Sequence, residues 1–379
     1  MKTDQNFISF YPNSLEGKTV VVGLSGGVDS SVTAAILKEQ GANVIGLFMK
    51  NWEELDERGV CKSSIEFKDV ELVCEKLDIP YYSIDFVKEY QENVFSEFLA
   101  GYKAGFTPNP DILCNREIKF NVFFKHAMDL GADYLATGHY CQIGLDENGN
   151  PILLKGEDQN KDQSYFLGAI SGDVLPRVLF PIGNIEKPVV REIAKKYDLA
   201  TKEKKDSTGI CFIGERNFKP FLSQYLKPKN GDFIELDSGE KVGIHCGAQF
   251  FTIGQRKGLG LGGPGEPWFV TKKDIDKNIV YVVRGDNHPS LYTNEATVEG
   301  FKFIGSEIDL NTTPLSIKVR YRQKDQACRV QVNTDGLLKV IFAEPQRAVT
   351  IGQSACFYFA NRCLGQGTII KTGKPLNEY

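Results

Sequence analysis

Two different periodicities of apolar and polar positions alternate along the first two hundred residues. Short apolar, β-branched runs predict strands, whereas apolar residues recurring every three or four positions predict helices. The predicted strands are residues 18–24, 42–49, 80–86 and 133–139. The predicted helices are residues 30–40, 67–77, 87–102 and 117–130, the first of them ended by Gly41.

Strands that alternate with helices predict an α/β fold with a doubly wound parallel sheet. In such folds ligands bind beyond the carboxyl ends of the strands. The loops after Leu24, Met49 and Thr137 are therefore expected to share one rim of the sheet.

The pattern changes after about residue 217. Residues 231–245 predict a strand, an Asp-Ser-Gly turn and a second strand, and a glycine-dense loop follows. From about Asn294 short strand-like runs alternate with turns, which predicts a small barrel or sandwich. We therefore expect a catalytic α/β domain (1–216), a small central β-rich domain (217–293) and a C-terminal β-barrel (294–379).

Composition narrows the class of protein. No run of eighteen apolar residues occurs among the 379, and the N-terminus has no apolar signal core. We therefore expect a cytoplasmic protein that is neither secreted nor membrane-bound. Nine cysteines, an odd number, favour a reducing compartment over a disulfide framework. A net charge of −4 means that a nucleic-acid partner would need a local basic face.

The stretch SGGVDSS, Ser25 to Ser31, follows the first predicted strand and opens a helix. Backbone amides of such a loop and of a helix N-terminus suit phosphate oxygens. Gly26 and Gly27 allow close approach of a ligand, and Asp29 is placed to hold a magnesium ion. The lysine of a Walker loop and the GxGxxG of a dinucleotide site are both missing. The stretch resembles the PP-loop of ATP pyrophosphatases, enzymes of the adenine nucleotide α-hydrolase-like fold, which implies that ATP binds here.

Two cysteines have unusually polar neighbours. Asp111 lies three residues before Cys114, and Arg116 follows it; Cys211 follows a lysine-rich segment. Nearby cations lower the pKa of a thiol and populate the reactive thiolate. A buried structural cysteine is the ordinary alternative, and an iron–sulfur cluster involving both cysteines is another. Asp111 is a candidate general acid or base; otherwise it would cap a helix or orient Arg116.

The motifs SGGVDSS, NPDILCNREIKF, ATGHY, NKDQSYFL, KKDSTGICFIGERNF, TIGQRKGLG and VRYRQ together resemble those of the bacterial tRNA-specific 2-thiouridylases. The resemblance runs in order along nearly the whole chain. It implies that Cys114 is the nucleophile and that Cys211 carries a persulfide. The residues implied to bind ATP are Gly23, Leu24, Ser25, Gly26, Gly27, Val28, Asp29, Ser30, Met49 and Gly138. Those implied to contact the target base or tRNA are Asn109, Pro110, Asp111, Lys161, Asp162, Gln163, Arg320 and Tyr321.

The resemblance also implies a reaction with ATP and Mg²⁺. The C2 oxygen of a wobble uridine, flipped out of the anticodon loop, would be adenylated and then replaced by sulfur. An upstream sulfur-carrier protein or a cysteine desulfurase would load Cys211. Whether the persulfide or free sulfide attacks stays open, and both routes end in a Cys114–Cys211 disulfide that a reductant must open.

Three other functions are weighed against this reaction. A PP-loop synthetase that forms amides would use ammonia from a glutaminase, for which no domain is visible in the sequence. A nucleotide-binding redox sensor would toggle Cys114 and Cys211, and a scaffold would bind tRNA without turnover. Release of pyrophosphate that depends on tRNA would separate the thiolase from the synthetase and the sensor.

Overall fold

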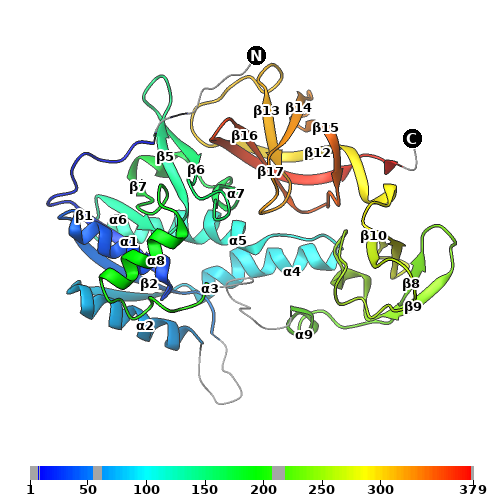
Figure 1. The fold of residues 1–379 in the computed structure, drawn as a ribbon, viewed down its shortest axis with the longest axis horizontal. Coiled ribbons are helices and arrows are strands. Elements are labelled where there is room, and N and C mark those ends of the chain that lie inside the picture. The colour runs from blue at the N-terminus through cyan, green and yellow to red at the C-terminus, as the bar shows by residue number, and fades with distance from the viewer. Residues whose placement is uncertain (1–6, 8, 54–61, 207–217, 377–379) are drawn as a thin grey trace.

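The computed structural model describes residues 7, 9–53, 62–206 and 218–376 (Figure 1). A five-stranded parallel sheet forms the first part of the molecule. Its order is β3 (Tyr81–Asp85), β2 (Asn43–Lys50), β1 (Thr19–Leu24), β4 (Tyr134–Thr137) and β7 (Val178–Leu179). All neighbouring strands are parallel. The four predicted strands and the shared rim at their carboxyl ends are thereby confirmed.

Helices cover both faces of this sheet. Successive residues of β1 point to opposite faces, and each of the two helix layers packs against alternate residues. Val20 and Val22 pack with α1 (Val28–Glu39), α2 (Lys62–Leu77) and α8 (Lys187–Lys196). Val21, between them, faces the other layer. That layer contains α3 (Val87–Tyr90), η1 (Gln91–Phe95), α4 (Ser96–Lys103), α5 (Pro110–Leu113), η2 (Cys114–Val122) and α6 (Phe123–Asp129). The doubly wound arrangement is confirmed.

Two helices begin five or more residues before the start that the sequence predicts. Helix α2 begins at Lys62, five residues before the predicted start. The helical run predicted to begin at residue 117 begins at Pro110, because Asn109 caps it and proline suits the first helical position. Within this run Cys114–Val122 is π-helical, with a kink at Phe120. Such π-helical segments are frequent at functional sites.

The C-terminal part is a closed six-stranded barrel. Its order is β12 (Tyr292–Phe303), β15 (Leu338–Arg347), β14 (Gln326–Val332), β13 (Leu315–Lys318), β16 (Ser354–Phe359) and β17 (Arg362–Thr372), and β12 pairs with β17. Closure leaves no free edge between these six strands. Val298, Ile317, Val340 and Phe357 are fully buried in the barrel core. The barrel predicted from the short strand-like runs is confirmed.

A hairpin from the first part extends the sheet of the barrel. Strands β5 (Cys141–Leu145) and β6 (Pro151–Lys155) lie within the predicted catalytic domain, yet β6 pairs with β17. The sequence pattern did not predict this hairpin. It joins the catalytic part to the barrel through backbone hydrogen bonds.

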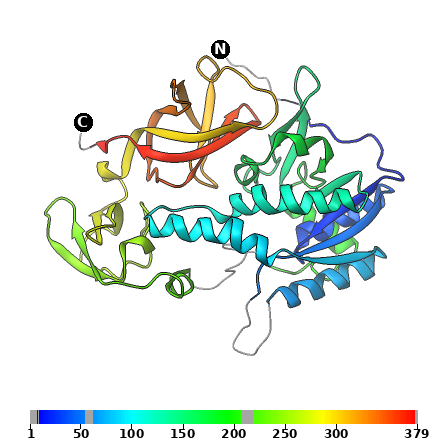
Figure 2. The ribbon, with the colours of Figure 1, turned by 180° about the vertical axis from the view of Figure 1, so that it is seen from behind.

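The central part is a small four-stranded sheet at the far end of α4 (Figure 2). Its order is β10 (Trp268–Asp274), β11 (Ile279–Arg284), β8 (Gly231–Glu235) and β9 (Lys241–His245), and α9 (Phe218–Ser223) precedes it. The predicted strand–turn–strand is confirmed as β8 and β9. Lys273 of β10 connects this sheet to the end of α4. Its Nζ donates hydrogen bonds to the carbonyl of Gly105, just after α4 (2.6 Å), and to that of Phe251 in the central part (2.7 Å). No helix among the described residues is long and apolar enough to cross a membrane.

Candidate active site

Serine hydroxyls fold the SGGVDSS loop back on itself at the carboxyl end of β1. Ser30 Oγ accepts a hydrogen bond from the amide of Ser25 (3.2 Å) and donates one to the carbonyl of Gly27 (3.2 Å). Ser31 Oγ donates to the same carbonyl (2.8 Å). Gly27 is the N-cap of α1 and has no side chain to accept from the first amides of the helix. These amides and the helix dipole suit an anion.

Two glycines make the close packing of this loop possible. Gly26 has a φ of +70°, and a Cβ there would lie 2.6 Å from the carbonyl oxygen of Glu66 in α2. Gly138, just after β4, has no room for a Cβ because it would lie 2.8 Å from the amide nitrogen of Ser30. The PP-loop is therefore held between α2 and the loop after β4.

A network of charged side chains surrounds the PP-loop carboxylate, Asp29. Its Oδ1 accepts from the hydroxyl of Tyr140 (2.8 Å) and from Lys187 Nζ (2.6 Å). Burial, and next the negative charge of Asp29, raise the pKa of Tyr140 well above its usual range. The tyrosine therefore stays protonated and keeps donating to Asp29.

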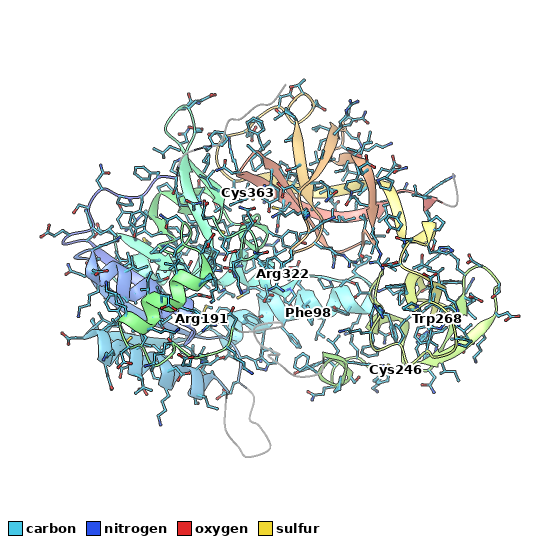
Figure 3. The ribbon with its side chains drawn as sticks, in the orientation of Figure 1. Phe98, Arg191, Cys246, Trp268, Arg322 and Cys363 are labelled. Carbon is cyan, nitrogen blue, oxygen red and sulfur yellow. The ribbon has the colours of Figure 1, made fainter. Side chains whose placement is uncertain are left out.

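Asp206, which shares Lys187 with Asp29, forms ion pairs with three cationic side chains. Its side chain pairs with Lys161 (2.7 Å), Lys187 (2.9 Å) and Arg191 (2.7 Å). Burial by itself raises the pKa of Asp206, but the hydrogen bonds from Lys161 and Lys187 outweigh this and lower the pKa to about 2. Figure 3 shows Arg191 projecting from α8 in the part that holds the parallel sheet, far from Trp268 in the central part. The residues of this network that the sequence did not single out are Tyr140, Lys187, Arg191 and Asp206.

Cys114 is buried at the start of the π-helical stretch, with 1% of its surface exposed. Before it, Asn109 Oδ1 accepts from the amide of Asp111 (3.0 Å). The N-cap is thus Asn109, and the alternative role of Asp111 as the cap is wrong. The other alternative is that Asp111 orients Arg116. The Arg116 side chain forms ion pairs with Glu97 (3.5 Å) and Glu117 (2.5 Å).

Contacts place the Cys114–Val122 stretch over the rim where the PP-loop begins. Gly23 in β1 packs against the ring of Phe123, since a Cβ there would lie 3.3 Å from it. The ring of Phe120 lies 5.8 Å from that of His139, next to Gly138. Burial, and next the charge of Lys119, hold the pKa of His139 well below its usual range. The structure therefore brings the helix of Cys114 and the PP-loop to the same edge of the sheet.

Asp162 and Tyr321, two of the residues predicted to contact tRNA, lie where the first part of the molecule meets the barrel. Gln163 accepts from the amide of Tyr140 (3.0 Å), and the carboxylate of Asp162 is buried against Lys318 of the barrel (2.9 Å). The ring of Tyr321 lies 4.3 Å from that of Phe166, whose carbonyl accepts from Asn115, beside Cys114 (3.2 Å).

Arg320, also predicted to contact tRNA, uses Nη2 within the protein. That nitrogen donates to the carbonyls of Ile253 (2.8 Å) and Ala348 (2.8 Å) and to the hydroxyl of Thr350 (3.2 Å). These bonds place Arg320 where the barrel meets the segment that precedes the glycine-dense loop. The contact with tRNA stays a prediction for this whole set.

The buried ion pair between Asp162 and Lys318 allows a prediction of stability. Replacing Lys318 with methionine leaves the carboxylate of Asp162, 1% exposed, without its cation. We expect the free energy of unfolding in urea to fall by about 3 kcal/mol, because one buried charge remains uncompensated. Lys371→Met, at an exposed position of β17, should change it by less than about 0.5 kcal/mol. Equal effects in the two variants would contradict the assigned role.

Cys211, the predicted persulfide carrier, lies outside the described residues, as does Cys61. Within the described ranges no group of three or more His, Cys, Asp or Glu side chains is placed to hold a metal ion. Because Cys211 is not among them, this does not test the iron–sulfur alternative.

Comparison with known proteins places the chain in a family. Family models match residues 18–215 (tRNA methyl transferase HUP domain), 219–284 (tRNA methyl transferase PRC-barrel domain) and 293–369 (Aminomethyltransferase beta-barrel domain). The tRNA-specific 2-thiouridylase MnmA of Protochlamydia amoebophila is 55% identical over 356 residues, 94% of each chain. The chain belongs to the tRNA-specific 2-thiouridylase family. The enzyme of the same name from Bacillus subtilis is 54% identical over 93% of this chain and 95% of its own.

The family models are named after methyl transfer, but full-length relatives of this family are named for thiolation. Among solved structures, a U34-tRNA thiolase NcsA from Methanococcus maripaludis with its [4Fe-4S] cluster matches at 18% identity and a TM-score of 0.34. It covers 50% of this chain and 61% of its own. A match this distant says nothing about the chemistry of the present site.

Proposed function

We propose that this protein uses ATP to replace the C2 oxygen of a wobble uridine in tRNA with sulfur, giving 2-thiouridine, AMP and pyrophosphate. The observation that carries the proposal is the meeting of two elements at one rim. The PP-loop packs on Gly138, and the helix of Cys114 packs on Gly23 through Phe123. The PP-loop and the helix that carries Cys114 therefore meet at one edge of the sheet, and the proposed substrate would lie between them.

The first step needs the oxygen of the uracil to become a leaving group. The C2 oxygen attacks the α-phosphorus of ATP, pyrophosphate departs, and the oxygen then carries AMP. Amides of the SGGVDSS loop and the N-terminus of α1 would stabilise the departing pyrophosphate. Mg²⁺ would arrive with ATP and supply charge neutralisation, and Asp29, 32% exposed, is the loop carboxylate that would hold it.

The second step delivers sulfur to C2. A persulfide on Cys211, loaded by an upstream sulfur-carrier protein, supplies the sulfur atom. Either the terminal sulfur attacks C2 and expels AMP, and Cys114 then attacks the sulfur of Cys211, or Cys114 first releases sulfide, which attacks C2. Both routes leave a Cys114–Cys211 disulfide, so a thiol reductant restores the enzyme. Asp111 is proposed to act as the general acid or base that takes up or supplies a proton in this step.

The burial of Cys114 suits this chemistry, because a water-poor site protects an adenylated base from hydrolysis. Asn109, Pro110 and Asp111 would contact the flipped base. Lys161, Asp162, Gln163, Arg320 and Tyr321 would contact the tRNA, which the protein would meet in the cytoplasm.

Release of pyrophosphate from ATP tests this proposal against the alternatives. With Mg²⁺ and ATP, release should require a tRNA transcript that has a wobble uridine, since the adenylated oxygen belongs to the tRNA and the site is proposed to recognise uracil. A matched transcript with cytidine at that position should give only background. Release independent of tRNA would favour an amide-forming synthetase or a nucleotide-binding sensor.

A further inference from the structure

Lys187 occupies a position that helix stability does not explain. It is the first residue of α8, directly after the N-cap Glu186 and before Pro188. A cation at a helix N-terminus is disfavoured by the helix dipole. The side chain is nevertheless only 9% exposed. A buried cation in this position needs carboxylate partners, and the two it has come from different parts of the chain.

The first partner is Asp29 of the PP-loop, whose Oδ1 lies 2.6 Å from Lys187 Nζ. The second is Asp206, whose Oδ1 lies 2.9 Å from the same nitrogen. One ammonium group thus bridges two carboxylates. The ring of Tyr140, 5.7 Å from the nitrogen, covers it, and the hydroxyl of the same tyrosine donates to Asp29.

The segment Thr201–Asp206 is joined to the PP-loop at a second point. Lys204 Nζ donates to the carbonyl of Gly26 (2.8 Å) and pairs with Asp69 of α2 (2.6 Å). Arg191 holds the backbone of the same segment, donating to the carbonyls of Lys202 (3.2 Å) and Lys204 (3.1 Å). The residues that end at Asp206 are therefore fastened to the loop that is proposed to bind pyrophosphate.

We propose that Lys187 is a positioning residue for the ATP-dependent step, and this rests on the function proposed above. By bridging Asp29 and Asp206, Lys187 holds the PP-loop carboxylate and the first turn of α1 in a fixed position relative to residues 201–206. It acts through these two carboxylates. Without the ammonium group, Asp29 loses its connection to Asp206, which keeps Lys161 and Arg191 as partners, and Asp29 moves away from the ATP phosphates.

The expected signature is a fall in kcat without a change in the affinity for tRNA. For Lys187→Met, kcat of tRNA-dependent pyrophosphate release should fall roughly 100-fold, the scale of a displacement of about 1 Å at a reacting centre. The KM for tRNA should change by less than about threefold, because Lys187 is buried. Lys195→Met, an exposed position on the same helix that pairs with Glu192, is the matched control and should behave as wild type.

A double-mutant cycle with Asp206→Asn separates positioning from direct contact with ATP. If Lys187 acts through the bridge, Lys187→Met and Asp206→Asn break the same connection, so the double variant should be no slower than the slower single variant. Lys187→Arg, which keeps a cation between the carboxylates, should recover at least about a tenth of wild-type kcat. Additive losses, or an unchanged kcat in Lys187→Met, would overturn the proposal.

Two further outcomes bear on the proposal: a Lys187→Met variant that does not fold, and a wild-type protein that shows no activity. If Lys187→Met fails to fold, judged by its thermal unfolding curve, Asp206→Asn decides alone: a kcat at least about tenfold lower at unchanged KM supports the bridge, and a wild-type kcat overturns it. If the wild-type protein itself shows no tRNA-dependent release of pyrophosphate, the proposed function fails. That outcome is distinct from a working enzyme that is indifferent to Lys187.

Discussion

Replacing Gly26 with alanine is expected to lower the rate of ATP-dependent pyrophosphate release by about 100-fold or more. Gly26 has a φ of +70°, and an added Cβ would lie 2.6 Å from the carbonyl oxygen of Glu66. The backbone of α2 supplies that oxygen, so it has little freedom to move, and the PP-loop must shift instead. Such a shift misplaces the amides that are proposed to bind the pyrophosphate. The measurement is the rate of pyrophosphate release with saturating tRNA.

Gly131→Ala is the matched control for this experiment. Gly131 has a φ of +81°, so the same left-handed backbone strain arises there, but an added Cβ would meet nothing within 4 Å. Both variants should lose about 1–2 kcal/mol of stability from strain, and only Gly26→Ala should lose activity. Equal activity in the two variants would show that the close packing of the PP-loop is not required.

The second large effect is expected at Cys114. Cys114→Ser should lower the rate of 2-thiouridine formation by at least about 1000-fold, because a serine hydroxyl is a far weaker nucleophile than a thiolate and forms no disulfide. Adenylation does not use the thiol, so one equivalent of pyrophosphate per enzyme should still be released. Product is measured by retardation of the tRNA on a mercury-containing gel, and pyrophosphate by rapid-quench sampling.

Cys74→Ser provides the comparison, because Cys74 is also buried in a helix, but in the layer on the opposite face of the sheet. It should thiolate tRNA at close to the wild-type rate. Thiolation by Cys114→Ser at the rate of Cys74→Ser would remove Cys114 from the mechanism. A loss of the pyrophosphate burst in Cys114→Ser would instead assign the cysteine to an earlier step.

The parts of the fold that sequence predicts well are those whose signal is local. The β-branched run before Leu24 and the stretch SGGVDSS lie within a few residues of each other, so both the strand and the loop were recognised. The start of the Cys114 helix also has a local signal, Asn109 followed by Pro110, whereas apolar periodicity alone predicts a start at residue 117. Capping chemistry decides that boundary.

The parts that sequence did not predict depend on contacts between distant segments. Lys187 meets Asp29, 158 residues away, and no spacing rule connects them. The same holds for the hairpin of β5 and β6, which looks like part of the α/β pattern until its pairing with β17 is seen. Asp162 is a third case, because its motif gave no sign that its carboxylate pairs with Lys318, 156 residues away. Long-range pairing of this kind is set by the tertiary fold.

Formation of 2-thiouridine at the wobble position is the most direct test of the proposed function. A tRNA transcript with a wobble uridine is incubated with the protein, ATP, Mg²⁺, a persulfide donor and a thiol reductant, and its nucleosides are analysed by mass spectrometry. A matched transcript with a wobble cytidine is treated in the same way. We expect 2-thiouridine from the first transcript only, and only with ATP. Persistent absence of 2-thiouridine, while the protein binds the tRNA and ATP, would contradict the proposed function.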